Sequence, residues 1–87
     1  MAKSNADFSV VIEMLGTISE DRTVPKNIRT SVDDAKAVLE GDGAVELKVS
    51  TAISSLDDII NDPNMPMYTR TQIWNIVSML EQMRKSI

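Results

Sequence analysis

The sequence of 87 residues contains neither cysteine nor histidine. Without cysteine there can be no disulfide and no thiolate metal site, and without histidine the usual zinc ligand and the usual general base are both missing. These absences exclude most enzyme classes. The lack of cysteine is also compatible with a reducing cytoplasm, where we expect the protein to reside.

Clustered positive charge is also missing. The nine lysines and arginines are scattered along a chain of net charge −4, whereas a protein that binds nucleic acid through phosphates needs them gathered together. The best local group is Arg22, Lys26 and Arg29. The charge pattern therefore argues against nucleic-acid binding, and this group marks the place where it would occur.

Long hydrophobic runs are absent as well. Residues 1–7 are mostly polar, and Glu13 interrupts the apolar stretch that follows them. We therefore expect no secretory signal, no membrane-spanning helix and no association with membranes. A chain of this length forms one small domain, residues 1–87, that buries roughly 60% of its unfolded surface.

The second half of the chain repeats the first at a constant offset, which takes Ile12 to Ile53. Such self-similarity indicates one supersecondary unit used twice, since a single unit of this size cannot bury its own apolar face. The repeated residues are those that a helical hairpin needs, so the repeat by itself predicts architecture and no specific activity. The identical pairs are Ile12 and Ile53, Leu15 and Leu56, Ile18 and Ile59, Asp21 and Asp62, Pro25 and Pro66, Arg29 and Arg70, Thr30 and Thr71, Leu39 and Leu80, and Glu40 and Glu81.

Each repeat has the pattern of two amphipathic helices. The spacing predicts a helix over about 6–19, with Ser4 or Asn5 as its N-cap and Asp7 in its first turn. A second helix has Pro25 at its first position and ends at Gly41-Asp42-Gly43. Further helices are expected over about 44–61 and about 66–85.

The resulting fold class is all-α. Nothing alternates with period two, and the short loops make consecutive helices antiparallel. We predict a four-helix bundle of two duplicated αα-hairpins, about 6–40 and about 44–86. Two stacked solenoid repeats share this description but would leave a large apolar flank uncovered. The predicted buried residues are Phe8, Val11, Ile12, Met14, Leu15, Ile18, Ile28, Val32, Ala35, Val38, Leu39, Val45, Val49, Ala52, Ile53, Leu56, Ile59, Ile60, Ile73, Ile76, Val77, Met79, Leu80, Met83 and Ile87.

A short group of polar residues recurs around each predicted turn. Asp21 precedes Pro25 by four residues and Arg29 by eight. The same spacing joins Asp62 to Pro66 and Arg70. A carboxylate in the turn can accept N–H bonds from the start of the next helix, and the arginine can reach back to it. We interpret these residues as structural rather than as a ligand site.

Two resemblances follow from these features. An Ile/Leu-rich helix, an aspartate in the turn, a proline and an arginine resemble the HEAT-type repeat. The length, the repeat, the missing cysteine and histidine, and the stretches Thr23–Arg29 and Asp62–Pro66 also resemble a family of small archaeal helical proteins of unassigned function. That resemblance implies an all-helical bundle and carries over no catalytic residue.

Candidate chemistry elsewhere in the sequence is weak. Asp58 and Asp62 stand one helical turn apart and could present oxygen ligands to a hard cation, but the EF-hand spacing is missing. A solvated helix face explains them better. Lys36 and Lys48 are isolated lysines of the kind that usually serve solubility. We therefore expect no catalytic residue, no metal site and no cofactor.

The repeats differ most clearly along the fourth predicted helix. Met67 and Trp74 project on one side, where the equivalent positions of the first repeat are Lys26 and Asp33. A position that one copy fills with charge does not need an apolar residue for folding. One interpretation is therefore an exposed interaction patch, formed with Tyr68 and Met65. The other is that Trp74 tucks against the first helix or the N-terminal tail, and the usual burial of large aromatics favours it.

These observations indicate a non-enzymatic protein-protein interaction module or a small homodimer. The alternative from another class is a nucleic-acid or ribonucleoprotein accessory protein, which would bind in a salt-sensitive way. A third possibility, an enzyme with an unfamiliar site, requires a pocket with convergent polar groups that no spacing here suggests.

Overall fold

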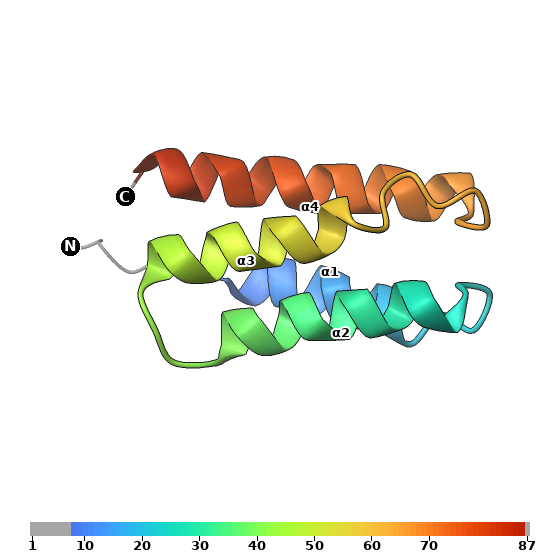
Figure 1. The fold of residues 1–87 in the computed structure, drawn as a ribbon, viewed down its shortest axis with the longest axis horizontal. Helices are drawn as coiled ribbons and strands as arrows, with labels where there is room; N and C mark the ends of the chain where they lie inside the picture. The colour runs from blue at the N-terminus through green and yellow to red at the C-terminus, as the bar shows by residue number, and fades with distance from the viewer. Residues whose placement is uncertain (1–7, 87) are drawn as a thin grey trace.

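The protein, described by a computed structural model over residues 8–86, consists of four α-helices. They are α1 (Ser9–Ser19), α2 (Lys26–Glu40), α3 (Val45–Asp57) and α4 (Met67–Ser86). No strand occurs within these residues. Consecutive helices pack antiparallel and α4 also contacts α1, which closes the bundle (Figure 1). The predicted all-α four-helix architecture is confirmed.

Pro25 and Pro66 lie one residue before α2 and α4 rather than at the first helical position. Pro25 combines φ −55° with an extended ψ of 150°. Its carbonyl oxygen accepts the N–H groups of the third and fourth residues after it, both at 3.1 Å, and Pro66 does the same at 3.1 and 3.0 Å. Each proline therefore stands directly before its helix and accepts the first helical hydrogen bonds. Its ring fixes φ, and its missing N–H is not needed there.

The first helix starts later than predicted. α1 begins at Ser9, and the carbonyl oxygen of Phe8 accepts its first backbone bond, at 2.8 Å from the N–H of Ile12. The predicted capping residues Ser4, Asn5 and Asp7 lie outside the described residues.

The third helix ends earlier than predicted, at Asp57 instead of residue 61. Beyond Asp58 the backbone hydrogen bonds join residues three positions apart instead of four. The N–H of Ile59 donates to the carbonyl of Leu56 at 3.1 Å, and the N–H of Asp62 donates to that of Ile59 at 3.0 Å. The α-helix ends in this tighter winding, and Ile59 within it is buried.

The two glycines of the loop between α2 and α3 have different backbone conformations. Gly41 follows α2 in an extended conformation, with φ −83°. The positive φ, 135°, belongs to Gly43. The residue with positive φ therefore lies three positions beyond the helix end at Glu40.

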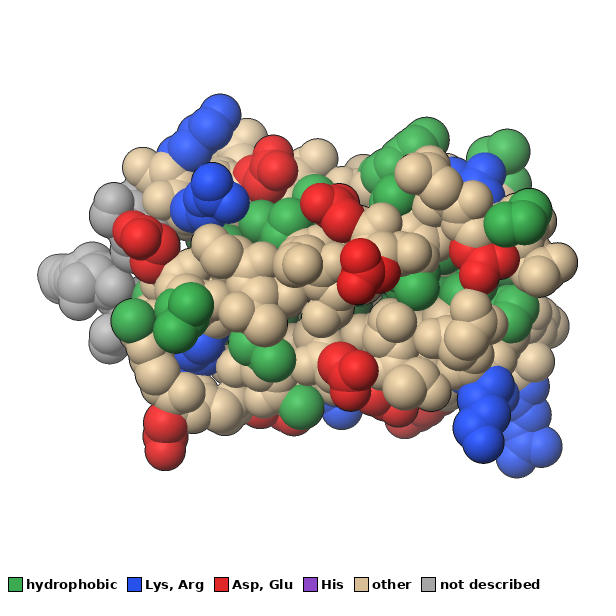
Figure 2. Space-filling view, in the orientation of Figure 1, with side chains coloured by type: hydrophobic (Ala, Val, Ile, Leu, Met, Phe, Trp, Pro, Cys, Tyr) green, Lys and Arg blue, Asp and Glu red, His purple; other side chains and the backbone are tan. Residues whose placement is uncertain are grey.

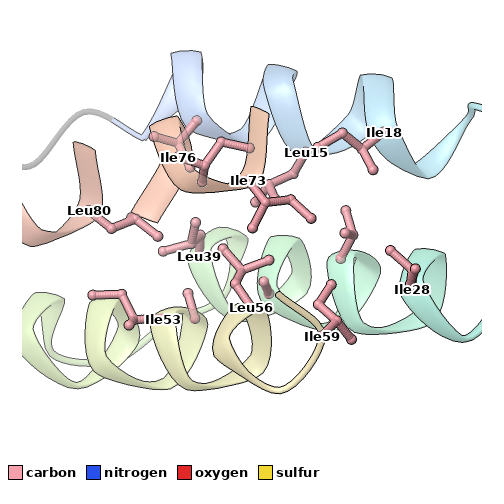
Figure 3. Packing of buried hydrophobic residues seen from close by; sticks show 14 of the residues in the cluster. Leu15, Ile18, Ile28, Leu39, Ile53, Leu56, Ile59, Ile73, Ile76 and Leu80 are labelled. Carbon is pink, nitrogen blue, oxygen red and sulfur yellow. The ribbon is translucent and has the colours of Figure 1, made fainter. Parts of the chain in front are cut away.

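One hydrophobic core runs through the bundle, with side chains from all four helices meeting between them (Figure 3). Val24 and Met65, from the two inter-helix turns, join it although neither was predicted. Several predicted core residues are only partly buried, namely Ile12, Met14, Val38, Val45, Ile60, Val77, Met79 and Met83, and Ile87 lies outside the described residues. The buried set is Phe8, Val11, Leu15, Ile18, Val24, Ile28, Val32, Ala35, Leu39, Val49, Ala52, Ile53, Leu56, Ile59, Met65, Ile73, Ile76 and Leu80.

Among the described residues, one polar side chain is buried in this core. Thr69 is fully buried, and its hydroxyl has no hydrogen-bond partner within residues 8–86. The equivalent position of the first repeat holds Ile28, which is also fully buried. A buried hydroxyl without a partner loses its water and gains nothing in exchange. Thr69 is therefore a local defect in an otherwise apolar layer.

Thr69→Val is expected to raise the free energy of unfolding by about 1 kcal/mol, because it removes the desolvated hydroxyl at nearly constant volume. Urea denaturation measures this change. The matched control is Thr71→Val on the exposed side of α4, where the hydroxyl donates to the carbonyl of Met67 at 3.2 Å. A destabilised Thr69→Val protein would contradict the assignment.

Candidate functional site

The turns within the two hairpins, between α1 and α2 and between α3 and α4, lie at the same end of the bundle (Figure 1). In each, the aspartate carboxylate closes the turn on a residue two positions later. Oδ1 of Asp21 accepts the N–H of Thr23 at 2.9 Å and its hydroxyl at 2.6 Å. Oδ1 of Asp62 accepts the N–H of Asn64 at 2.8 Å. The bonds therefore hold the turn itself, whereas the prediction placed their donors at the start of the next helix.

The second oxygen of each carboxylate is held by the other hairpin. The hydroxyl of Tyr68, on α4, donates to Oδ2 of Asp21 at 3.1 Å. The amide of Asn27, on α2, donates to Oδ2 of Asp62 at 2.9 Å. We call these four residues the turn clasp. Asn27 and Tyr68 occupy equivalent positions of the two repeats, although the sequence alone does not show that they cross between hairpins.

The repeated arginines bond to backbone carbonyls instead of reaching the aspartate side chains. Nε of Arg29 donates to the carbonyl of Val24 at 3.1 Å. Nε and Nη2 of Arg70 donate to the carbonyls of Ile60 and Asp62 at 3.0 and 2.8 Å. The predicted arginine-to-carboxylate contact is therefore wrong, because the side chain satisfies carbonyls that the end of the preceding helix and its turn leave free.

Hydrogen bonding lowers the pKa of both clasp carboxylates below the ordinary aspartate value. For Asp21 the largest cause is the hydroxyl of Thr23, followed by its N–H, while the hydroxyl of Tyr68 contributes least. For Asp62 the N–H of Asn64 comes first and the amide of Asn27 second, with a smaller attraction from Arg70. In both, desolvation opposes the shift.

Because the folded pKa is lower than the unfolded one, the stabilising effect of each ionised carboxylate is present above the unfolded pKa. It is lost as the pH falls through the folded pKa. Asn27→Ala is expected to raise the pKa of Asp62 towards its ordinary value and to move acid unfolding to higher pH. Carboxyl carbon NMR titration and circular dichroism measure the two effects.

Tyr68→Phe is the reciprocal experiment, and it should raise the pKa of Asp21 by less, since the Tyr68 bond is the weakest contribution there. Each variant controls the other, because Asn27→Ala should leave Asp21 unchanged and Tyr68→Phe should leave Asp62 unchanged. Equal effects of either variant on both carboxylates would contradict the clasp.

The outer face of α4 carries exposed apolar side chains. Trp74 is 54% exposed, Met67 69% and Tyr68 52%. We call these three residues the α4 patch. Figure 2 shows hydrophobic side chains gathered over the beginning of α4, close to the turn end of the bundle. Within residues 8–86 more than half of the Trp74 surface stays exposed, in contrast to the burial that aromatic statistics favour. Met65 does not belong to the patch, because it is buried at 5% exposure and packs into the core.

The corresponding surface of the first hairpin is polar. The hydroxyl of Ser19, at the end of α1, donates to the carboxylate of Asp33 on α2. One turn further along, the end of the Lys36 side chain, Cε and Nζ, lies beside Gly16. This edge is therefore built from a hydrogen-bonded pair and a charged side chain.

The second hairpin replaces all three polar residues of that edge. The positions equivalent to Ser19, Asp33 and Lys36 hold, in the same order, Ile60, Trp74 and Val77. Ile60 and Val77 are half-buried and pack against the core, whereas Trp74 remains largely exposed. The change from polar to apolar therefore extends beyond the two positions, Met67 and Trp74, that the sequence repeat singled out.

Sites for ions or reactive groups are sparse. No group of three or more acidic side chains among the described residues is arranged to hold a metal ion. A shallow hollow of about 320 Å³ on the second half of α4 is lined by Ser78, Met79, Gln82 and Met83 among the described residues. All four are uncharged. The hollow therefore offers no general acid or base from these residues.

The basic group of the first turn is smaller than the sequence suggests. Arg22 and Lys26 are exposed, but Arg29 is half-buried and donates to the carbonyl of Val24. Only two of the three cations face solvent, and Asp21 lies beside them.

The protein is therefore a small all-α protein. Its two helical hairpins form a closed bundle, and its last helix has an apolar outer face. No helix within residues 8–86 is long and apolar enough to span a bilayer. The chain belongs to the uncharacterised protein family UPF0147, whose model matches residues 1–83.

Relatives in this family come from archaea. A UPF0147 protein of Methanocaldococcus jannaschii is 53% identical over 72 residues, covering 82% of this chain and 77% of its own. One from Methanothermobacter thermautotrophicus is 43% identical over 83 residues, covering 94% and 81%. The resemblance to a family of small archaeal helical proteins is confirmed.

Two solved structures share the fold. The crystal structure of MMP1188, a protein of unknown function, has a TM-score of 0.84 and 48% identity, and the match covers 92% of this chain and 96% of that one. A UPF0147 protein from Thermoplasma acidophilum gives 0.82 and 41%, with 86% and 89% covered.

Proposed function

We propose that this protein is a non-enzymatic interaction module that binds a polypeptide through the α4 patch. The supporting observation is the exposure of Met67 and Trp74 at positions where the first hairpin has Lys26 and Asp33. The fold tolerates charge at these positions, so their apolar character serves something other than folding. Tryptophan is also among the residues that contribute most to protein interfaces.

The same proposal explains the rest of the surface without catalysis. The carboxylates of Asp21 and Asp62 are committed to turn and clasp bonds, and the α4 hollow is lined by uncharged side chains. An exposed apolar patch rimmed by polar residues is a typical feature of binding surfaces. We place the protein in the cytoplasm, in keeping with a sequence without cysteine.

The test is capture from extracts of the native cell with tagged wild-type protein and tagged Trp74→Asp. Wild type is expected to retain one or more polypeptides, an untagged copy of itself included. Trp74→Asp is expected to lose roughly 90% or more of that retention, because a charge at the patch centre must be desolvated on binding. Quantitative mass spectrometry measures it.

Leu47→Asp provides the matched control. Leu47 is 66% exposed on α3, so this variant also replaces an exposed apolar side chain by a carboxylate, but outside the α4 patch. It should retain what wild type retains. Equal retention by wild type and Trp74→Asp would refute the proposed function.

A further inference from the structure

We infer that the polypeptide bound by the α4 patch is a second copy of this chain, with the two α4 helices packed antiparallel across a twofold axis near Thr71. The inference rests on the proposed function and adds the identity of the partner. Its support is the charge distribution, the spacing of the patch residues and the area that they expose.

The solvent side of α4 is free of charge over most of its length. Residues 71–80 contain no charged side chain. Arg70, just before them, is half-buried and directs its guanidinium to the carbonyls of Ile60 and Asp62. The equivalent stretch of α2, residues 30–39, contains three charged side chains. The uncharged stretch is therefore a feature of α4 that the equivalent helix α2 does not share.

Like charges oppose self-association over the other helices. The chain has a net charge of −4, and exposed acidic residues lie on α1, α2 and α3. Examples are Glu13, Asp34 and Asp57. Two identical acidic surfaces repel each other, whereas two uncharged faces do not. A second copy therefore approaches most favourably through α4.

The spacing of the patch residues fits an antiparallel pair. Met67 and Trp74 are seven positions apart in the sequence, which places them on one side of α4 about two turns from each other. Antiparallel pairing sets Met67 against Trp74 of the second copy, and the reverse contact follows by symmetry. The axis then passes between residues 70 and 71. Methionine sulfur also packs favourably against aromatic rings.

Tyr68 occupies the edge of this contact. Its hydroxyl donates to Asp21, while the residue as a whole is 52% exposed. The three patch residues together expose on the order of 350 Å² in each copy. Two such patches give about 700 Å² for the apolar centre of an interface near the lower size limit of about 1,200 Å². We therefore expect a dimer that forms in the micromolar range.

The absence of native cysteine allows a direct test of the geometry. Thr71→Cys places a thiol near the proposed axis, where the two sulfurs can meet, so mild oxidation is expected to convert most of the protein to a covalent dimer. Thr30→Cys is the matched control, because Thr30 is exposed at the equivalent position of α2. It should remain mostly monomeric under the same conditions.

Sedimentation equilibrium tests the association without a disulfide. Wild type and Leu47→Asp are expected to dimerise alike, whereas Trp74→Asp should raise the Kd roughly 30-fold. Circular dichroism checks that the exposed substitution leaves the helices intact. A dimer that is unaffected by Trp74→Asp, or a Trp74-dependent dimer that Thr71→Cys does not link, overturns the inference.

The inference and the proposed function can fail separately. If wild type stays monomeric up to about 0.5 mM, where a micromolar Kd would give mostly dimer, the second copy is not the partner. Trp74-dependent capture of a different polypeptide in that case would leave the proposed function standing. Monomeric wild type without any Trp74-dependent capture would overturn both.

Discussion

The turn within each hairpin, between α1 and α2 and between α3 and α4, is held by a side chain from the opposite hairpin. Tyr68 bonds to Asp21 and Asn27 bonds to Asp62, so neither turn can move without disturbing the other. The remaining oxygen of each carboxylate closes its own turn, which fixes where the next helix starts. At the other end the bundle relies on the short loop 41–44 and on the ammonium of Lys48, 5.2 Å from the centre of the Phe8 ring. The relative placement of the hairpins is therefore set mainly by polar bonds at one end and by the apolar core between them.

Residues at matching positions of the two hairpins share a backbone role but not always a side-chain role. Ile28 fills the core where Thr69 leaves a hydroxyl without a partner, and Asp33 bonds to Ser19 where Trp74 faces solvent. Such pairs separate what the fold demands from what it merely tolerates. The turn aspartates and prolines are the same in both hairpins and most core positions stay apolar, whereas the outer edge changes from polar to apolar. The apolar edge of α3 and α4 is consequently the part of the surface that folding explains least.

The helices and most of the core could be predicted from the sequence, because apolar spacing and proline placement are local signals. The clasp could not, since the bonds of Asn27 and Tyr68 join residues 35 and 47 positions apart and depend on how the hairpins dock. The partners of Arg29 and Arg70 could not be predicted either. Their charge predicts a carboxylate partner, whereas the folded turns place free backbone carbonyls within their reach. The exposure of Trp74 could not be predicted from the sequence for a related reason. Its exposure depends on whether a neighbouring element covers it, and helical periodicity carries no information on that.

The topology also decides how the molecule responds to load. α1 begins and α4 ends at the end of the bundle opposite the inter-helix turns (Figure 1). A pull applied through these two helix ends acts across the helix axes, so it peels α1 and α4 away from α2 and α3 starting at that end instead of shearing them along their length. The turn clasp lies at the opposite end of the bundle and is therefore the last part to open. A tether attached beside Phe8 or Ser86 therefore leaves the turn end, and the beginning of α4 next to it, free for docking.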